Sequence, residues 1–309
     1  MVNREYGRWL IPATLLLLAS WQPLLLYLVS LAIFGLPHVI WEAAFLRRRY
    51  AARWPRHWWW MLGAILLAQA VARTAFWMGT FSSEATQIVD LLSLLMLGAV
   101  IVFAPADAGW NVRIAGLLLS GAMLWLLHNG AILEALLALA ILHNFTPLAM
   151  AWDMARHNDG QRRLAWRVTA LFVLPLLLVC GLWGMPASST AIAGHAWLLD
   201  GQLPANWGGA HRSALLSAIV LSQCLHYYCV IVLLPRAEKQ PPAAPLMPPW
   251  ASAIAIGLAM LICAYYVFDY EDARKLYAVA SGMHAWVEWP VLLMALLGAR
   301  PNPRLPRTS

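Results

Sequence analysis

The residues best suited to chemistry lie inside apolar stretches of this sequence. His38 and Glu42 stand one helical turn apart in the segment Gly35-Leu36-Pro37-His38-Val39-Ile40-Trp41-Glu42, whose other residues are almost all apolar. An ionisable side chain in hydrocarbon is costly and usually marks a functional position. The stretch is therefore a candidate site, provided that other segments bring polar partners to the same depth.

Three further histidines lie well inside three other apolar runs. These are His143, His226 and His284, the last followed four residues later by Glu288. With a rise of about 1.5 Å per residue, His38 and His226 lie ~12 Å from the cytoplasmic ends of their predicted helices, His143 ~14 Å and His284 ~20 Å. Boundary errors of about two to four residues make these depths equivalent. The sequence thus predicts four imidazoles in one layer.

Imidazole is the commonest metal ligand in proteins and suits iron, copper and zinc. Four neutral imidazoles around one cation would satisfy polar groups that hydrocarbon cannot satisfy. Glu42 and Glu288 each follow a histidine by four residues on the same helix face, where a carboxylate can support a ligand or bind the metal itself. We predict an iron site, with copper as the alternative, in which the metal ligands are His38, His143, His226 and His284 and the catalytic carboxylates are Glu42 and Glu288.

Uncharged polar residues near these positions could line a substrate pocket, and we single out Asn144, Tyr227 and Tyr228. The two tyrosines could equally serve packing. A membrane histidine can also act only as a hydrogen-bonding group between helices, and this alternative stays open for each predicted ligand. Three more histidines lie at or beyond the outer boundary, and the sequence does not show whether they bind anything: His128, His195 and His211.

The composition identifies the class of protein that must position these residues. Of 309 residues, 62% are hydrophobic and only 11% are charged, whereas soluble domains average about 25% charged residues. The net charge of +7 comes from short basic clusters between apolar runs, a pattern typical of cytoplasmic loops rather than of a nucleic-acid surface. The four cysteines lie within apolar runs without metal-binding spacing. We therefore expect an integral membrane protein that binds no nucleic acid.

We expect one all-α transmembrane helix bundle over residues 1–309, because a helix of roughly 20 apolar residues spans a bilayer. About ten spans (8–10) are predicted: 6–21, 23–46, 58–79, 87–104, 112–128, 131–152, 166–184, 212–234, 250–268 and 275–297. The first could instead form one kinked entry helix with the second. All basic clusters then fall on one side, which predicts cytoplasmic N- and C-termini in the inner (plasma) membrane. Residues 185–211 form the long external loop, and residues 235–249 a Pro-rich cytoplasmic linker.

The stretch from Gly35 to Glu42 resembles the G-[IVL]-P-H-G-x-x-D motif of the bacterial Brp/Blh family of membrane β-carotene 15,15′-dioxygenases. Val39 replaces the glycine of that motif and Glu42 its aspartate, and a closely spaced histidine pair expected in a later helix is missing. The resemblance implies a polytopic protein with a histidine-bound non-haem iron that cleaves an apolar polyene with dioxygen. It implies His38 as an iron ligand and Glu42 as the acidic position.

Together these features predict a membrane-embedded, histidine-ligated metal oxygenase or oxidase that acts with dioxygen on a lipid-soluble, carotenoid-like substrate. Two other functions remain open. Pairs of histidines on facing helices could bind haem axially in an electron-carrying protein. Alternatively, buried histidines and glutamates could relay protons in a transporter. The sequence does not determine the substrate, the metal or the oligomeric state.

Overall fold

The chain was analysed as a computed structural model that describes residues 3–104, 109–130, 132–157, 159–182, 209–237 and 248–297. Within these ranges the secondary structure is helical, as the apolar runs predict. Most of the predicted external loop, residues 185–208, and the middle of the predicted Pro-rich linker, residues 238–247, lie outside the described residues. The ends of the linker differ from the prediction, because residues 235–237 are helical and Pro249 begins the next helix.

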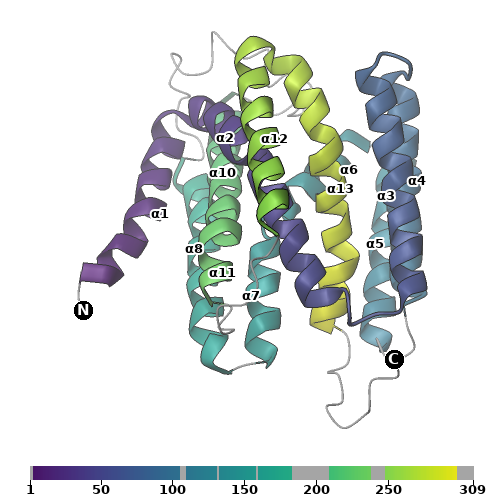
Figure 1. Ribbon diagram of the computed structural model, residues 1–309, viewed down its shortest axis with the longest axis horizontal. Coiled ribbons are helices and arrows are strands. Elements are labelled where there is room, and N and C mark those ends of the chain that lie inside the picture. Colours follow the sequence, from purple (N-terminus) through teal and green to yellow (C-terminus); the bar gives the residue numbers. More distant parts are fainter. Residues whose placement is uncertain are drawn as a thin grey trace.

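The long helices α2, α3, α4 and α5 alternate in direction along the bundle, as do α7 and α8 and then α12 and α13 (Figure 1). Their bounds are α1 Asn3–Trp21, α2 Pro23–Tyr50, α3 Arg56–Trp77, α4 Ser83–Val102, α5 Trp110–His128, α6 Ile132–His143, α7 Thr146–His157, α8 Arg162–Leu182, α10 Gly209–Tyr228, α11 Leu234–Ala237, α12 Pro249–Phe268 and α13 Tyr270–Leu297. A π-helical segment, Cys229–Leu233, joins α10 to α11. Residues 6–21 and 23–46 therefore belong to two separate helices.

Seven helices in the described residues are long and apolar enough to cross a membrane. They are α2, α3, α4, α12 and α13, together with Asp159–Gly181 and Ala214–Ala237; shorter apolar helices cover Trp9–Trp21 and Trp110–Leu126. Large apolar side chains are exposed on the outside of the bundle, among them Val267 at 81% and Phe268 at 87%. In water such a surface would be unfavourable, whereas in lipid it is the expected one. The chain is thus built as a membrane protein.

One predicted span differs in form. Residues 131–152 were expected to form a single helix, but the structure divides them into α6 and α7, with Asn144 and Phe145 between them. Pro147 has no amide hydrogen, and its ring would clash with the carbonyl oxygen of His143 in a continuous helix. The helix therefore ends at His143, and Thr146 starts the next one. A broken helix at membrane depth is tolerated where protein covers its freed polar groups.

The long helix α2 runs obliquely through the centre of the bundle (Figure 1). It packs against α10, α12 and α13, while α3, α4 and α5 lie on one side and α1, α7 and α8 on the other. The main apolar core includes the fully buried Trp58, Ile101, Leu221 and Leu225. The polar residues of α2 and α13 are thereby enclosed between helices.

Two ion-paired groups tie helices together. Arg73 of α3 and Asp90 of α4 form an ion pair at 2.8 Å, and Gln69 donates to the same carboxylate. A second group joins α2 to α7. Asp153 of α7 is fully buried and accepts hydrogen bonds from Arg49 and Tyr50 of α2 at 2.8 and 3.0 Å.

Candidate metal centre

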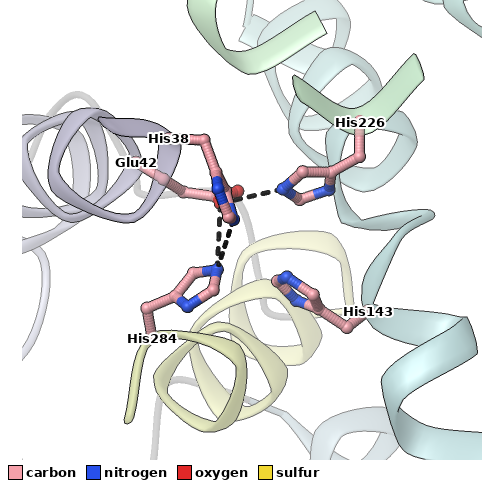
Figure 2. Close-up of side chains that lie close together, drawn as sticks. All are labelled: His38, Glu42, His143, His226 and His284. Carbon is pink, nitrogen blue, oxygen red and sulfur yellow. Dashed lines mark hydrogen bonds and ion pairs between the residues drawn. The ribbon is translucent and has the colours of Figure 1, made fainter. Parts of the chain in front are cut away.

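Four helices bring the four predicted histidines to one point (Figure 2). His38 and Glu42 come from α2, His143 is the last residue of α6, His226 lies near the end of α10, and His284 lies in the middle of α13. One ligand atom from each of these five residues lies within 4.8 Å of all the others. All five side chains are buried, and Glu42 and His226 are completely inaccessible. We call these five residues the metal group.

The separations within the metal group suit a single ion. His38 Nε2 is 3.2 Å from His284 Nε2, and Glu42 Oε2 is 3.1 Å from His226 Nε2 and 3.5 Å from His284 Nε2. Ligand atoms about 2.1 Å from one ion are about 3.0 Å apart when adjacent in an octahedron and about 3.4 Å in a tetrahedron. Two ions about 3.5–4 Å apart would need more widely spread ligands. The metal group therefore fits one ion.

The orientation of His38 is fixed by its own helix. Its Nδ1 lies 3.0 Å from the carbonyl oxygen of Phe34, which can only accept a hydrogen bond. The proton of the neutral ring therefore sits on Nδ1, and the lone pair of Nε2 points toward the other members of the metal group. This arrangement, in which one ring nitrogen is held by an outer acceptor and the other is left free, is the usual one for a metal-binding histidine.

Glu288 lies beside the metal group as a further carboxylate. Its Oε2 is 2.9 Å from His143 Nδ1, and the side chain also lies close to Glu42 and Thr146. The sequence placed each glutamate on the face of a histidine in its own helix, but the structure pairs them across helices. Glu42 of α2 contacts the histidines of α10 and α13, and Glu288 of α13 contacts His143 at the end of α6.

Several polar atoms of this region make no hydrogen bond of normal geometry among the described residues. They are Glu42 Oε1, both carboxylate oxygens of Glu288, and the Nδ1 atoms of His143, His226 and His284. Buried polar atoms almost always have a partner, so such a concentration needs an explanation. The atoms that face one another are Nε2 of His38, His226 and His284 and Oε2 of Glu42, and a cation between them would give their lone pairs a partner. The residues present therefore fit a metal ion.

The electric charge of the region supports the same conclusion. Glu42 and Glu288 are both fully buried and lie next to one another. Neutral imidazoles do not balance the negative charge of ionised carboxylates. Uncompensated charge is expensive to bury. A divalent cation would compensate two carboxylates, whereas in its absence protons shared with His143 and His226 would have to do so. Metal binding and proton binding are thus competing ways to neutralise this site.

The predicted pocket residues separate into two groups. The ring of Tyr227 packs on His38, with a centroid distance of 4.2 Å. Asn144, in the break between α6 and α7, donates to Ser222 Oγ at 3.4 Å. Tyr228, in contrast, packs in the main apolar core. Tyr227 and Asn144 therefore lie beside members of the metal group.

The outer histidines are not brought into the metal group. His128, at the end of α5, is exposed, and His195 lies outside the described residues. His211 is in the first turn of α10, at the opposite end of that helix from His226. Thr146, another uncharged polar residue close to His143 in the sequence, stands next to Glu288.

A separate apolar groove lies between α2 and α12. It has a volume of about 240 Å³ and is lined by residues that include Pro37, Trp41, Ala259 and Cys263. Its lining positions on α2 are partly exposed, whereas His38 and Glu42 on the same helix are buried. The groove therefore faces away from the metal group.

Comparison of the chain with protein-family models, with curated proteins and with solved structures finds no match. The residues and geometry of the metal group are therefore the features that indicate a function.

Proposed function

We propose that this chain is a membrane-embedded metalloenzyme that binds one non-haem iron ion through the metal group and uses dioxygen to oxidise a lipid-soluble substrate. The observation that carries the proposal is the convergence of four buried imidazoles and one carboxylate, from four helices, with ligand atoms within 4.8 Å of one another. A cation would satisfy this donor set in hydrocarbon, and the use of four helices to build it argues for a function rather than for packing.

The donor set indicates which metals fit. Imidazole with carboxylate suits iron, copper or zinc, and an all-oxygen ligand set would be expected for magnesium or calcium. Five protein ligands would leave one position of an octahedron open. Bound iron would supply the ability to bind and reduce dioxygen at that position, and copper is the alternative with related chemistry.

The residues of the chain have distinct roles in this proposal. His38 is held by the Phe34 carbonyl, so that its Nε2 is directed to the metal before the metal binds. Glu42 supplies negative charge directly. Glu288, at 2.9 Å from His143 Nδ1, is positioned to hold the proton of that nitrogen and to keep the ring oriented. The surrounding apolar helices exclude water.

The proposed substrate class follows from the surroundings of the metal group. The site is enclosed within an apolar bundle, so a hydrophobic small molecule dissolved in membrane lipid can reach it more easily than a polar one. Tyr227 and Asn144 are the polar groups beside the metal group that could orient such a molecule. A carotenoid-like polyene, which the resemblance of the segment 35–42 implies, is one member of this class.

Two other functions differ from this proposal in specific ways. Haem needs its axial imidazoles on opposite faces of a porphyrin. Here the rings of neighbouring histidines contact one another, with centroids 4.6–5.2 Å apart, and that packing favours a single ion. A proton-relaying transporter is supported by the pairing of His143 with Glu288 at 2.9 Å and of His226 with Glu42 at 3.1 Å. That function requires no metal.

The test is the metal content and optical spectrum of detergent-purified protein. We expect one equivalent of iron per chain without a Soret band, and dioxygen consumption when a lipid-soluble polyene is added. His38→Ala should remove most of the iron. The matched control is His128→Ala, because His128 is exposed at the end of α5. Less than about a tenth of an equivalent of any transition metal in the unmodified protein would refute metal binding and favour the transporter.

For the orientation, we propose that the protein lies in the inner membrane with both termini on the cytoplasmic side. The support is that the arginine-rich ends of the helices, including the end of α2 and the starts of α3 and α8, lie at one end of the bundle (Figure 1). Cytoplasmic ends of membrane proteins carry such an excess. Fusing a reporter that is active only in the cytoplasm to the C-terminus tests this orientation, and an inactive fusion would reverse it.

A further inference from the structure

A tyrosine lies directly against one predicted ligand. The ring of Tyr227 is stacked at a tilt of 36° on His38, with centroids 4.2 Å apart, and its centroid is 5.9 Å from that of His226. Tyr227 is 5% exposed and comes from α10, whereas His38 comes from α2.

The hydroxyl of Tyr227 has a second tyrosine as its partner. Tyr227 and Tyr277 are hydrogen-bonded to one another, and Tyr277 is also buried, at 9% exposure. Gly35 makes room for this pair, because a Cβ atom at that position would lie 3.1 Å from Cε2 of Tyr277. Three helices thus cooperate to hold two phenols next to the metal group.

Further tyrosines extend from this pair toward the turn between α12 and α13. Tyr277 shares an apolar cluster with Tyr266, and Tyr27 and Tyr270 pack against the same cluster. The rings of Tyr266 and Tyr270 have centroids 5.5 Å apart. Tyr270 is the first residue of α13, at the end of the bundle where α12 joins α13 (Figure 1). The five tyrosines therefore connect the metal group with one boundary of the bundle, and we call them the tyrosine path.

Packing alone does not explain why these residues are tyrosines. Phenylalanine would fill nearly the same volume without burying a hydroxyl group, and burying a hydroxyl in apolar surroundings has a free-energy cost. Five phenols in one cluster multiply that cost. A phenol, unlike a phenyl ring, can lose one electron and one proton at a moderate potential and regain them.

We propose that the tyrosine path carries oxidising equivalents between the metal group and the membrane boundary, with Tyr227 as the residue that reacts first. This inference rests on the proposed function, because it needs a redox-active metal and an oxidant of the dioxygen or peroxide class. With hydrogen peroxide, two phenols each lose one electron and one proton, and the peroxide O–O bond breaks to give two water molecules. A quinol at the boundary restores both phenols, giving up two electrons and two protons to become a quinone.

The experiment uses the full-length protein in detergent, loaded with ferrous iron and mixed with hydrogen peroxide, and detects radicals by electron paramagnetic resonance. The unmodified protein should give a tyrosyl signal that narrows when ring-deuterated tyrosine is incorporated. Tyr227→Phe should lose the signal while iron content, measured on the same samples, stays unchanged. Tyr228→Phe is the matched control, because Tyr228 is the next residue, is similarly buried at 8%, and packs in the apolar core.

A second variant separates a path from an isolated radical. Tyr277→Phe should still form the radical at Tyr227, but a water-soluble quinol should quench it more slowly than in the unmodified protein. An undiminished signal in Tyr227→Phe, or no radical in iron-loaded unmodified protein, would overturn the proposal while leaving the metal site intact. Failure to bind iron at all would overturn the proposed function as well, and the metal analysis identifies that case.

Discussion

The substitution Glu42→Gln gives the sharpest test of the metal group. The substitution keeps the size of the side chain but removes the negative charge of Glu42, the carboxylate member of the metal group. Oε2 of Glu42 lies 3.1 Å from His226 Nε2 and 3.5 Å from His284 Nε2. Changes even to outer partners of metal ligands lower affinity by about 10- to 100-fold. A direct anionic ligand should lie at the upper end, so we expect about 100-fold weaker binding.

The effect on stability follows from binding linkage. A metal concentration of about 1,000 times the dissociation constant stabilises the unmodified protein by about 4 kcal/mol. The same concentration is about 10 times the weakened constant and stabilises the variant by about 1.4 kcal/mol, a loss of about 2.7 kcal/mol. For a chain of this size, the metal-induced rise in melting temperature should fall by about 4 °C. Thermal unfolding in detergent, with and without metal, measures this rise.

The metal-free protein distinguishes the two ways of neutralising the site. If a metal is the natural counter-charge, Glu42→Gln removes one of two adjacent carboxylates and leaves the metal-free melting temperature equal or higher. If Glu42 instead forms a permanent ion pair with His226, the substitution breaks a buried pair and lowers the metal-free melting temperature. A variant that loses stability without metal, and has the same metal-induced rise as the unmodified protein, would refute the metal site.

Three further substitutions test the supporting structure. Asp153→Asn removes the negative charge that pairs with Arg49 and Arg53. It should lower the free energy of unfolding by about 3 kcal/mol in denaturant titrations without changing metal affinity. A loss below about 0.5 kcal/mol would contradict the buried pairing. Pro147→Ala restores an amide hydrogen and should therefore favour a helix that continues past His143. This change should weaken iron binding roughly tenfold. Unchanged iron affinity would show that the break between α6 and α7 does not position His143. Gly35→Ala places a methyl group 3.1 Å from Cε2 of Tyr277 and should reduce the yield of the tyrosyl radical at unchanged iron content, whereas an equal yield would mean that the ring can shift freely.

The sequence could predict the helices well because each apolar run satisfies its own backbone. In hydrocarbon a helix is the structure that pairs its amides within one segment, so length and hydropathy predict α2, α4 and α12 without tertiary information. The exception was residues 131–152, which were predicted as one span although Pro147 lies within them. Whether a proline kinks or ends a membrane helix depends on what satisfies the freed backbone groups. Here the amides of Asn144 and Phe145 bond to the carbonyl oxygens of Ile141 and Leu142, which closes the end of α6.

The partners of the two carboxylates were the least predictable part of the candidate site. Spacing of four residues places Glu42 on the face of His38, and Glu288 on the face of His284, but contact within one helix competes with contacts to neighbours. The tilt and rotation of α10 and α13 direct His226 and His284 to Glu42, and place Glu288 beside His143. Such rotations result from packing over whole helix faces, which no local pattern records. The same reason explains why Tyr227 faces His38 while Tyr228 faces the apolar core.

The sequence by itself determined that this protein is helical, that it is built for a membrane, and that four histidines lie at similar depths, because hydropathy and helix rise are local properties of the chain. Only the tertiary structure decided that these histidines meet, which carboxylate each one contacts, and that a row of tyrosines leads away from them. These features depend on the relative rotation of separate helices, which is fixed by the packing of side chains far apart in the sequence.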